Sequence, residues 1–85
     1  MIVEFDPDKD ASNVADHGIS LARAADMIPL ATIADDRFDY GEERFRTYGQ
    51  IDGRAYCLVF TMRGENIRAI SLRRAHFQEI KRHVP

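Results

Sequence analysis

This sequence lacks several features that stabilise small domains by cross-links or that place proteins in a membrane. It has one cysteine, Cys57, which excludes an intramolecular disulfide, and the apolar run around it is typical of an inert core residue. The three histidines show no paired spacing with one another or with the cysteine, so we expect no zinc site and no cofactor. No hydrophobic run approaches the roughly 18 residues that a transmembrane helix needs.

We also expect no targeting signal at the start of this sequence. The segment MIVEFDPDKD is acidic within its first six residues, unlike a secretory signal, so we expect a cytoplasmic protein. The 85 residues predict a single domain over residues 1–85. Such a domain buries only about 60–65% of its unfolded surface, and a partner that binds the folded chain would stabilise it.

Charge is distributed unevenly along the chain. The net charge is −2, yet residues 1–43 carry −8 and residues 44–85 carry +6. Ten of the twelve cations are arginine, whose rigid five-donor fork suits phosphate oxygens. Two interpretations stay open: a phosphate-binding surface, or charges that only solvate one face of a sheet.

The order of apolar runs and turn residues predicts an α+β fold of the type β-α-α-β-β-β-β-α. Asp6, Pro7 and Gly18 delimit a first helix over residues 7–17, and Ser20 begins a second that Pro29 ends. Asp52–Gly53 is a strong hairpin signal. The remaining predicted elements are strands at 2–5, 30–36, 42–51, 53–63 and 66–74, and a short helix within 74–84. The helices are expected to cover one face of an antiparallel twisted sheet.

Strand alternation sorts the charged side chains onto faces of this sheet. In residues 42–51 one set reads Glu42, Arg44, Arg46 and Tyr48. Arg68 and Arg73 fall in opposite sets, so period alone leaves open which of them faces Arg44, and a bulge would change the answer. Tyr48 or Tyr56 beside these arginines would offer a base-stacking surface.

The first predicted helix offers a second polar set. Lys9, Asn13 and His17 are spaced four residues apart and form a ridge, which predicts a solvated helix face. His17 lies next to the helix C-terminus, where its cation interacts favourably with the helix dipole.

Three stretches of the chain together resemble the BrnT family of bacterial toxins, small members of the wider RelE-like ribonuclease group. They are FDPDKDASNVADHGISL, EERFRTYG and NIRAISLRRA, and a later match is Glu79. The matching positions are Phe5, Asp6, Pro7, Lys9, Asn13, His17, Gly18, Ser20, Glu42, Arg44, Phe45, Arg68, Ile70, Ser71, Arg73 and Ala75. The chain departs from the family pattern at Asp16, where Lys is usual, and at Leu21 and His83.

The resemblance implies a RelE-like fold and a toxin of a type II toxin–antitoxin system that cleaves RNA and blocks translation. It also implies a cognate antitoxin, similar to BrnA, that resembles a ribbon-helix-helix protein. The complex of the two would repress its own operon, so operator DNA would be bound only through the antitoxin.

With no metal cluster in the sequence, the expected chemistry is attack of the RNA 2′-hydroxyl on the adjacent phosphate. Arg44, Arg68 and Arg73 are expected to hold the phosphate. The base is expected among Glu43, Glu42 and His17, with Lys9 as a supporting cation. Further RNA contacts are expected from Arg46, Tyr48, Arg63 and Arg74. The alternative is a non-catalytic RNA- or partner-binding module, such as an inactive toxin relic.

Overall fold

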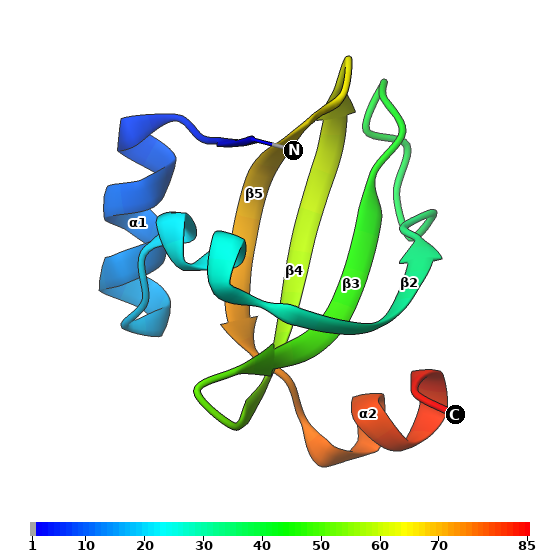
Figure 1. The fold of residues 1–85 in the computed structure, drawn as a ribbon. Helices are drawn as coiled ribbons and strands as arrows, with labels where there is room; N and C mark the ends of the chain where they lie inside the picture. The colour runs from blue at the N-terminus through cyan, green and yellow to red at the C-terminus, as the bar shows by residue number, and fades with distance from the viewer. Residues whose placement is uncertain (1) are drawn as a thin grey trace.

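The structure, a computed structural model, describes residues 2–85 and has the expected α+β architecture (Figure 1). Five strands form one sheet in the order β1-β5-β4-β3-β2. Within residues 2–85, only β1 and β5 pair in parallel. The elements are β1 (Val3–Glu4), α1 (Pro7–His17), the 3₁₀ helix η1 (Leu21–Asp26), β2 (Ile28–Ala34), β3 (Phe45–Ile51), β4 (Arg54–Arg63), β5 (Asn66–Arg74) and α2 (Phe77–His83).

The first helix begins and ends at the predicted residues. The Asp6 carboxylate accepts a hydrogen bond from the backbone N–H of Asp8, and Pro7 occupies the first turn, where its missing N–H costs nothing. Gly18 adopts a left-handed conformation, with φ of 72°, and its N–H donates to the Val14 carbonyl.

The second helical segment is shorter than predicted. It is the 3₁₀ helix η1, which is capped by Ser20 and ends at Asp26. Strand β2 begins at Ile28, so Pro29 lies within β2 and does not end the helix. Proline is tolerated there because β2 is an edge strand. Gly49 on β3 permits the start of β2 to approach β3 closely, since a Cβ at position 49 would lie 2.5 Å from the Ile28 carbonyl oxygen.

The predicted hairpin between β3 and β4 is confirmed. Asp52 and Gly53 both have positive φ, 53° and 75°, as the two central residues of a type I′ turn require. The backbone twist of such a turn matches that of the flanking strands, so the Asp–Gly pair fixes their register.

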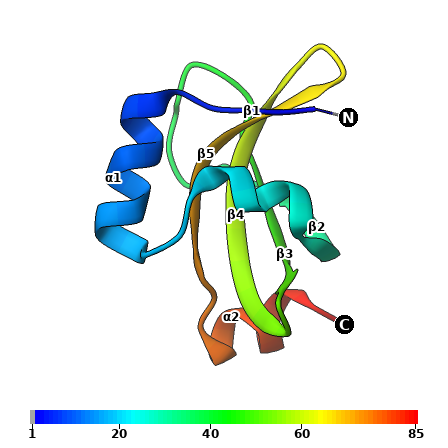
Figure 2. The same cartoon turned by 60° about the vertical axis from the view of Figure 1, so that its left-hand side comes forward.

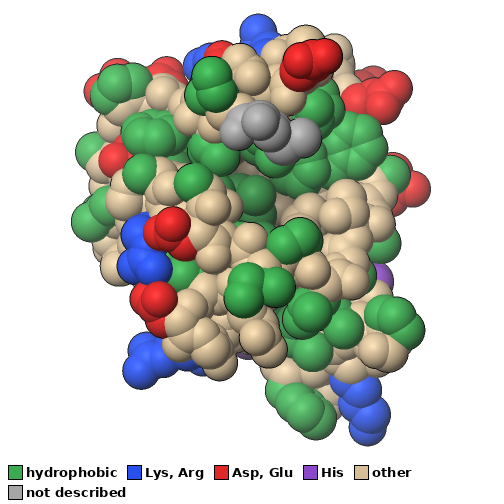
Figure 3. Space-filling model, in the orientation of Figure 1, with side chains coloured by type: hydrophobic (Ala, Val, Ile, Leu, Met, Phe, Trp, Pro, Cys, Tyr) green, Lys and Arg blue, Asp and Glu red, His purple; other side chains and the backbone are tan. Residues whose placement is uncertain are grey.

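Helices α1 and η1 cover one side of the sheet, with α1 beside β5 (Figure 2). The core on this side is apolar and comprises Leu21, Ala24, Ile51, Leu58, Phe60, Ala69 and Leu72. In the orientation of Figure 1, hydrophobic side chains are spread across the surface, while Lys and Arg lie towards its margins (Figure 3). None of the helices within residues 2–85 is long and apolar enough to cross a membrane.

The prediction of a solvated polar ridge on α1 is wrong at Asn13. This side chain is buried, donates to the Leu72 carbonyl at 2.8 Å and accepts from the Leu72 N–H at 3.0 Å. Asn13 thus pairs with the β5 edge beyond the point where the two-residue strand β1 ends. Because Asn13 faces inward, Val14 is 46% exposed.

Candidate functional site

A β-bulge places Arg68 and Arg73 on the same face of the sheet. The β4–β5 register shifts by one residue, which leaves Ile70 as the extra residue of β5. Arg68 therefore lies opposite Thr61, and Arg73 lies opposite Cys57. Since Cys57 and Thr61 alternate onto one face of β4, both arginines point to that face.

Two arginines at the neighbouring strand share this face, one on β3 and one directly before it. Arg46 on β3 lies opposite Val59, whose side chain has the same orientation as those of Cys57 and Thr61. Arg44 stands two residues before Arg46, so it alternates onto the same side. We call the surface formed by Arg44, Arg46, Arg68 and Arg73 the arginine face.

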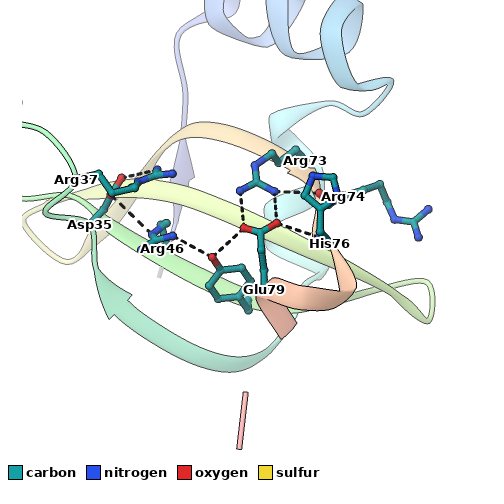
Figure 4. A network of polar contacts seen from close by, with 8 residues as sticks. Asp35, Arg37, Arg46, Arg73, Arg74, His76 and Glu79 are labelled. Carbon is teal, nitrogen blue, oxygen red and sulfur yellow. Dashed lines mark hydrogen bonds and ion pairs between the residues drawn. The ribbon is translucent and has the colours of Figure 1, made fainter. Parts of the chain in front are cut away.

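Helix α2 contacts one end of the arginine face through Glu79, which points toward Arg73 (Figure 4). Arg73 donates two hydrogen bonds to the Glu79 carboxylate, each 2.8 Å long. The Tyr48 hydroxyl donates to Glu79 and accepts from Arg46, both at 3.1 Å, and the His83 ring stacks on Tyr48 with 5.2 Å between centroids. Hydrogen bonding to Arg73 lowers the pKa of Glu79 to about 2, whereas burial raises the pKa of Tyr48 to about 12.

The loop between β2 and β3 closes the other end. The buried Asp35 carboxylate accepts two hydrogen bonds from Arg37, at 2.7 and 3.0 Å, and one from the Tyr40 hydroxyl. The paired guanidinium of Arg37 lowers the pKa of Asp35. Arg46 Nε lies 3.8 Å from Asp35 and has no hydrogen-bond partner among residues 2–85. The Arg44 guanidinium stacks over the Tyr40 ring, 4.1 Å from its centroid.

Arg68 differs from these arginines because no hydrogen bond or ion pair in the described part of the chain engages its side chain. Its neighbour Thr61 donates to the Glu43 carbonyl at 2.7 Å. Beside Thr61 is a groove of about 530 Å³ whose charged lining is Glu42, Glu43 and Arg63. Arg63 and the two carboxylates predicted as bases are therefore at one end of the arginine face.

Two residues expected to contact RNA are placed differently. Tyr48 is fully buried beneath α2, so its ring is not available for base stacking. Arg74 lies opposite Tyr56 on the other face of the sheet, with its guanidinium over the Tyr56 ring. Neither tyrosine offers the open stacking surface that strand alternation predicted.

The two cationic residues expected on α1 are not brought to the arginines. Lys9 and His17 are exposed on a helix that packs with η1 on the opposite side of the sheet, and no described contact joins them to the arginine face. Asp16, which departs from the family pattern, is exposed on the same helix.

Sequence reasoning missed the residues that hold the arginines in place. Asp35 falls at the end of the predicted strand over residues 30–36, and Arg37 and Tyr40 fall in the polar turn after it, so none of the three was predicted as a site residue. In the structure β2 ends at Ala34, and Asp35 follows it directly. Within residues 2–85 no group of three or more His, Cys, Asp or Glu side chains is arranged to hold a metal ion.

Comparison with known proteins first defines the class of fold. The chain is similar to the 1.1 Å crystal structure of the Brucella abortus ribonuclease toxin, BrnT, with a TM-score of 0.65 and 23% sequence identity. The match covers 89% of this chain and 99% of that one, and it establishes a shared fold. No curated protein sequence matches this chain.

The family follows from a second comparison. The model for the ribonuclease toxin, BrnT, of type II toxin–antitoxin systems matches residues 5–79. The chain therefore belongs to the BrnT family of ribonuclease toxins, and a type II system implies an antitoxin protein as its partner.

Proposed function

We propose that this chain cleaves RNA on the arginine face without a metal ion. The observation that supports this most is the bulge at Ile70, which gathers Arg68 and Arg73 beside Arg46. Clustered guanidinium groups stabilise the charge that builds on a phosphate during in-line attack. Family membership as a ribonuclease toxin supports the same conclusion.

In the proposed step the 2′-oxygen forms a bond to phosphorus and the bond from phosphorus to the 5′-oxygen breaks. The products are a 2′,3′-cyclic phosphate and a 5′-hydroxyl. Glu43 is the proposed base, because it is exposed at the groove lined by Thr61, the cross-strand neighbour of Arg68, whereas Glu42 is paired with Arg44 at 3.2 Å. Water supplies the proton to the leaving oxygen, and positioning by the arginines carries much of the rate.

We further propose that the toxin inhibits translation in the cytoplasm and is neutralised by a BrnA-like antitoxin of the ribbon-helix-helix class. Together they would repress their operon, with operator DNA bound only through the antitoxin. Carboxylates of the antitoxin laid over the arginine face would exclude RNA phosphates, and the affinity of that complex would fall with rising salt.

The test is cleavage of a single-stranded RNA by purified protein in excess EDTA, with an all-deoxy strand of the same sequence as the matched control. We expect the RNA to be cut at an undiminished rate and the deoxy strand to remain intact. Loss of cleavage in EDTA, restored by a divalent cation, would contradict the mechanism. Binding without cleavage would instead favour a non-catalytic module. Growth arrest on induction, relieved by co-expressing a neighbouring antitoxin gene, tests the toxin role.

A further inference from the structure

The loop between β2 and β3 carries an exposed aromatic ring at the end of the arginine face. Phe38 is 69% exposed, and its ring meets Tyr40 edge to face, with 5.8 Å between centroids and 72° between planes. Tyr40 in turn lies under the Arg44 guanidinium. A continuous row of contacting side chains therefore leads from the loop to the arginine face.

Phe38 lies on a loop with internal hydrogen bonds on both sides of it. Before it, Arg37 is bound to the buried Asp35. After it, the Asp39 carboxylate accepts from the Gly41 N–H at 3.0 Å, and the positive φ of Gly41 completes the turn. The ring is thus presented to solvent by a structured segment, which lowers the entropy lost when a ligand binds it.

A cavity of about 290 Å³ adjoins the ring, close to the lower limit for small-molecule sites of roughly 300 Å³. Its lining includes Phe38, Tyr40 and Arg44, together with exposed carboxylates of the loop. These carboxylates repel a phosphate group, so the cavity suits the base of a nucleotide better than its phosphate.

We propose that Phe38 is a stacking platform for one nucleobase of single-stranded RNA whose phosphates lie on the arginine face. The inference rests on the proposed function. It replaces the stacking role expected of Tyr48 and Tyr56, which are not open on this face. An aromatic platform strengthens single-strand binding by about five- to 150-fold per stacked base and is tolerant of sequence.

The chain provides a matched control in Phe77. This residue is 74% exposed on α2, and α2 lies at the opposite end of β3 from the loop (Figure 1). Among the described residues Phe77 has no stacked arginine or aromatic partner. Substituting Phe77 therefore removes an exposed phenyl ring, as substituting Phe38 does, but leaves the proposed platform unchanged.

The first experiment measures affinity for a 2′-O-methyl RNA oligonucleotide, which blocks attack by the 2′-oxygen, at fixed salt. Phe38→Ala should weaken binding by about five- to 150-fold, Phe38→Trp should keep it, and Phe77→Ala should leave it unchanged. Equal affinity of Phe38→Ala and the wild type would overturn the platform while leaving the proposed function intact. Absence of RNA binding by the wild type would overturn both.

The second experiment uses Phe38→Trp as its own probe, because the chain contains no other tryptophan. The RNA should quench its fluorescence, and an oligonucleotide of equal length and charge that carries only abasic residues should bind without quenching. Equal quenching by both oligonucleotides would overturn the proposal. The proposal would also be overturned if Phe38→Ala lost its affinity for the antitoxin and kept its affinity for RNA, because the ring would then bind a protein.

Discussion

On the side of the sheet that α1 and η1 cover, Leu58, Phe60 and Leu72 pack into an apolar core. On the other side, the sheet carries Arg73 on β5 and Arg46 on β3, which are held by carboxylates and a tyrosine hydroxyl. Apolar packing is indifferent to pH and weakly affected by salt, whereas charged pairs respond to both. The comparison indicates that the helix side maintains the fold and that the arginine face is available for anionic ligands.

The arginine face itself contains two kinds of arginine. Arg73 is neutralised by a two-pronged pair with Glu79, and its side chain is 25% exposed. Arg68 has no such partner in the described residues. We infer that Arg73, besides adding positive charge to the arginine face, fixes the position of α2 through Glu79, while Arg68 keeps its whole charge for a phosphate.

The largest expected effect is on catalysis. Arg68→Ala should slow RNA cleavage by about 10²–10³-fold, equivalent to about 2.7–4 kcal/mol, because one guanidinium is lost from the charged transition state. The melting temperature should stay near that of the wild type. Arg54→Ala is the matched control, since Arg54 is exposed at the far end of β4. Full activity in the Arg68 variant would remove Arg68 from the site.

The next effect is a pH dependence of stability. The pKa of Glu79 is about 2, below its ordinary 4.5, so the unfolded chain binds the proton more tightly. The stabilisation, up to about 3 kcal/mol, is present above pH 4.5 and is lost as the pH falls towards 2. Glu79→Gln should abolish this part of the acid dependence, as measured by urea unfolding at several pH values. If the wild type and Glu79→Gln lose the same free energy of unfolding between pH 4.5 and 2, the pair of Arg73 and Glu79 contributes nothing to stability.

A smaller effect is expected on the helix side. Asn13→Ala removes the hydrogen bonds to both backbone groups of Leu72 and should cost about 2–3 kcal/mol of folding free energy. Cleavage per folded molecule should be unchanged, because Asn13 lies away from the arginine face. A lowered rate at full folding would show that the two sides are coupled.

The elements of the fold were largely predictable because their signals are local. Asp6, Pro7 and Gly18 delimit α1, and Asp52–Gly53 forms the hairpin, all through backbone preferences readable within a few residues. The early end of η1 was not predicted. It requires β2 to approach β3 closely at Ile28, and the residue that leaves room for this, Gly49, is more than twenty residues away in the sequence.

The candidate site was less predictable because its geometry depends on pairing between distant segments. One extra residue at Ile70 decides the face of Arg68, and sequence period cannot detect such a bulge. Tyr48 is covered by α2, whose His83 ring stacks on it, and Asn13 turns inward to pair with the part of β5 that the short strand β1 does not reach. Polar residues with buried partners look the same in sequence as solvated ones.

The most direct test of the division between the two sides measures RNA cleavage rate and melting temperature together for Arg68→Ala and Asn13→Ala. We predict opposite outcomes: Arg68→Ala loses rate and keeps its melting temperature, while Asn13→Ala melts earlier and cleaves normally when folded. A parallel fall of rate and stability in both variants would show that the arginine face has no function separate from the fold, which would contradict the division between the two sides.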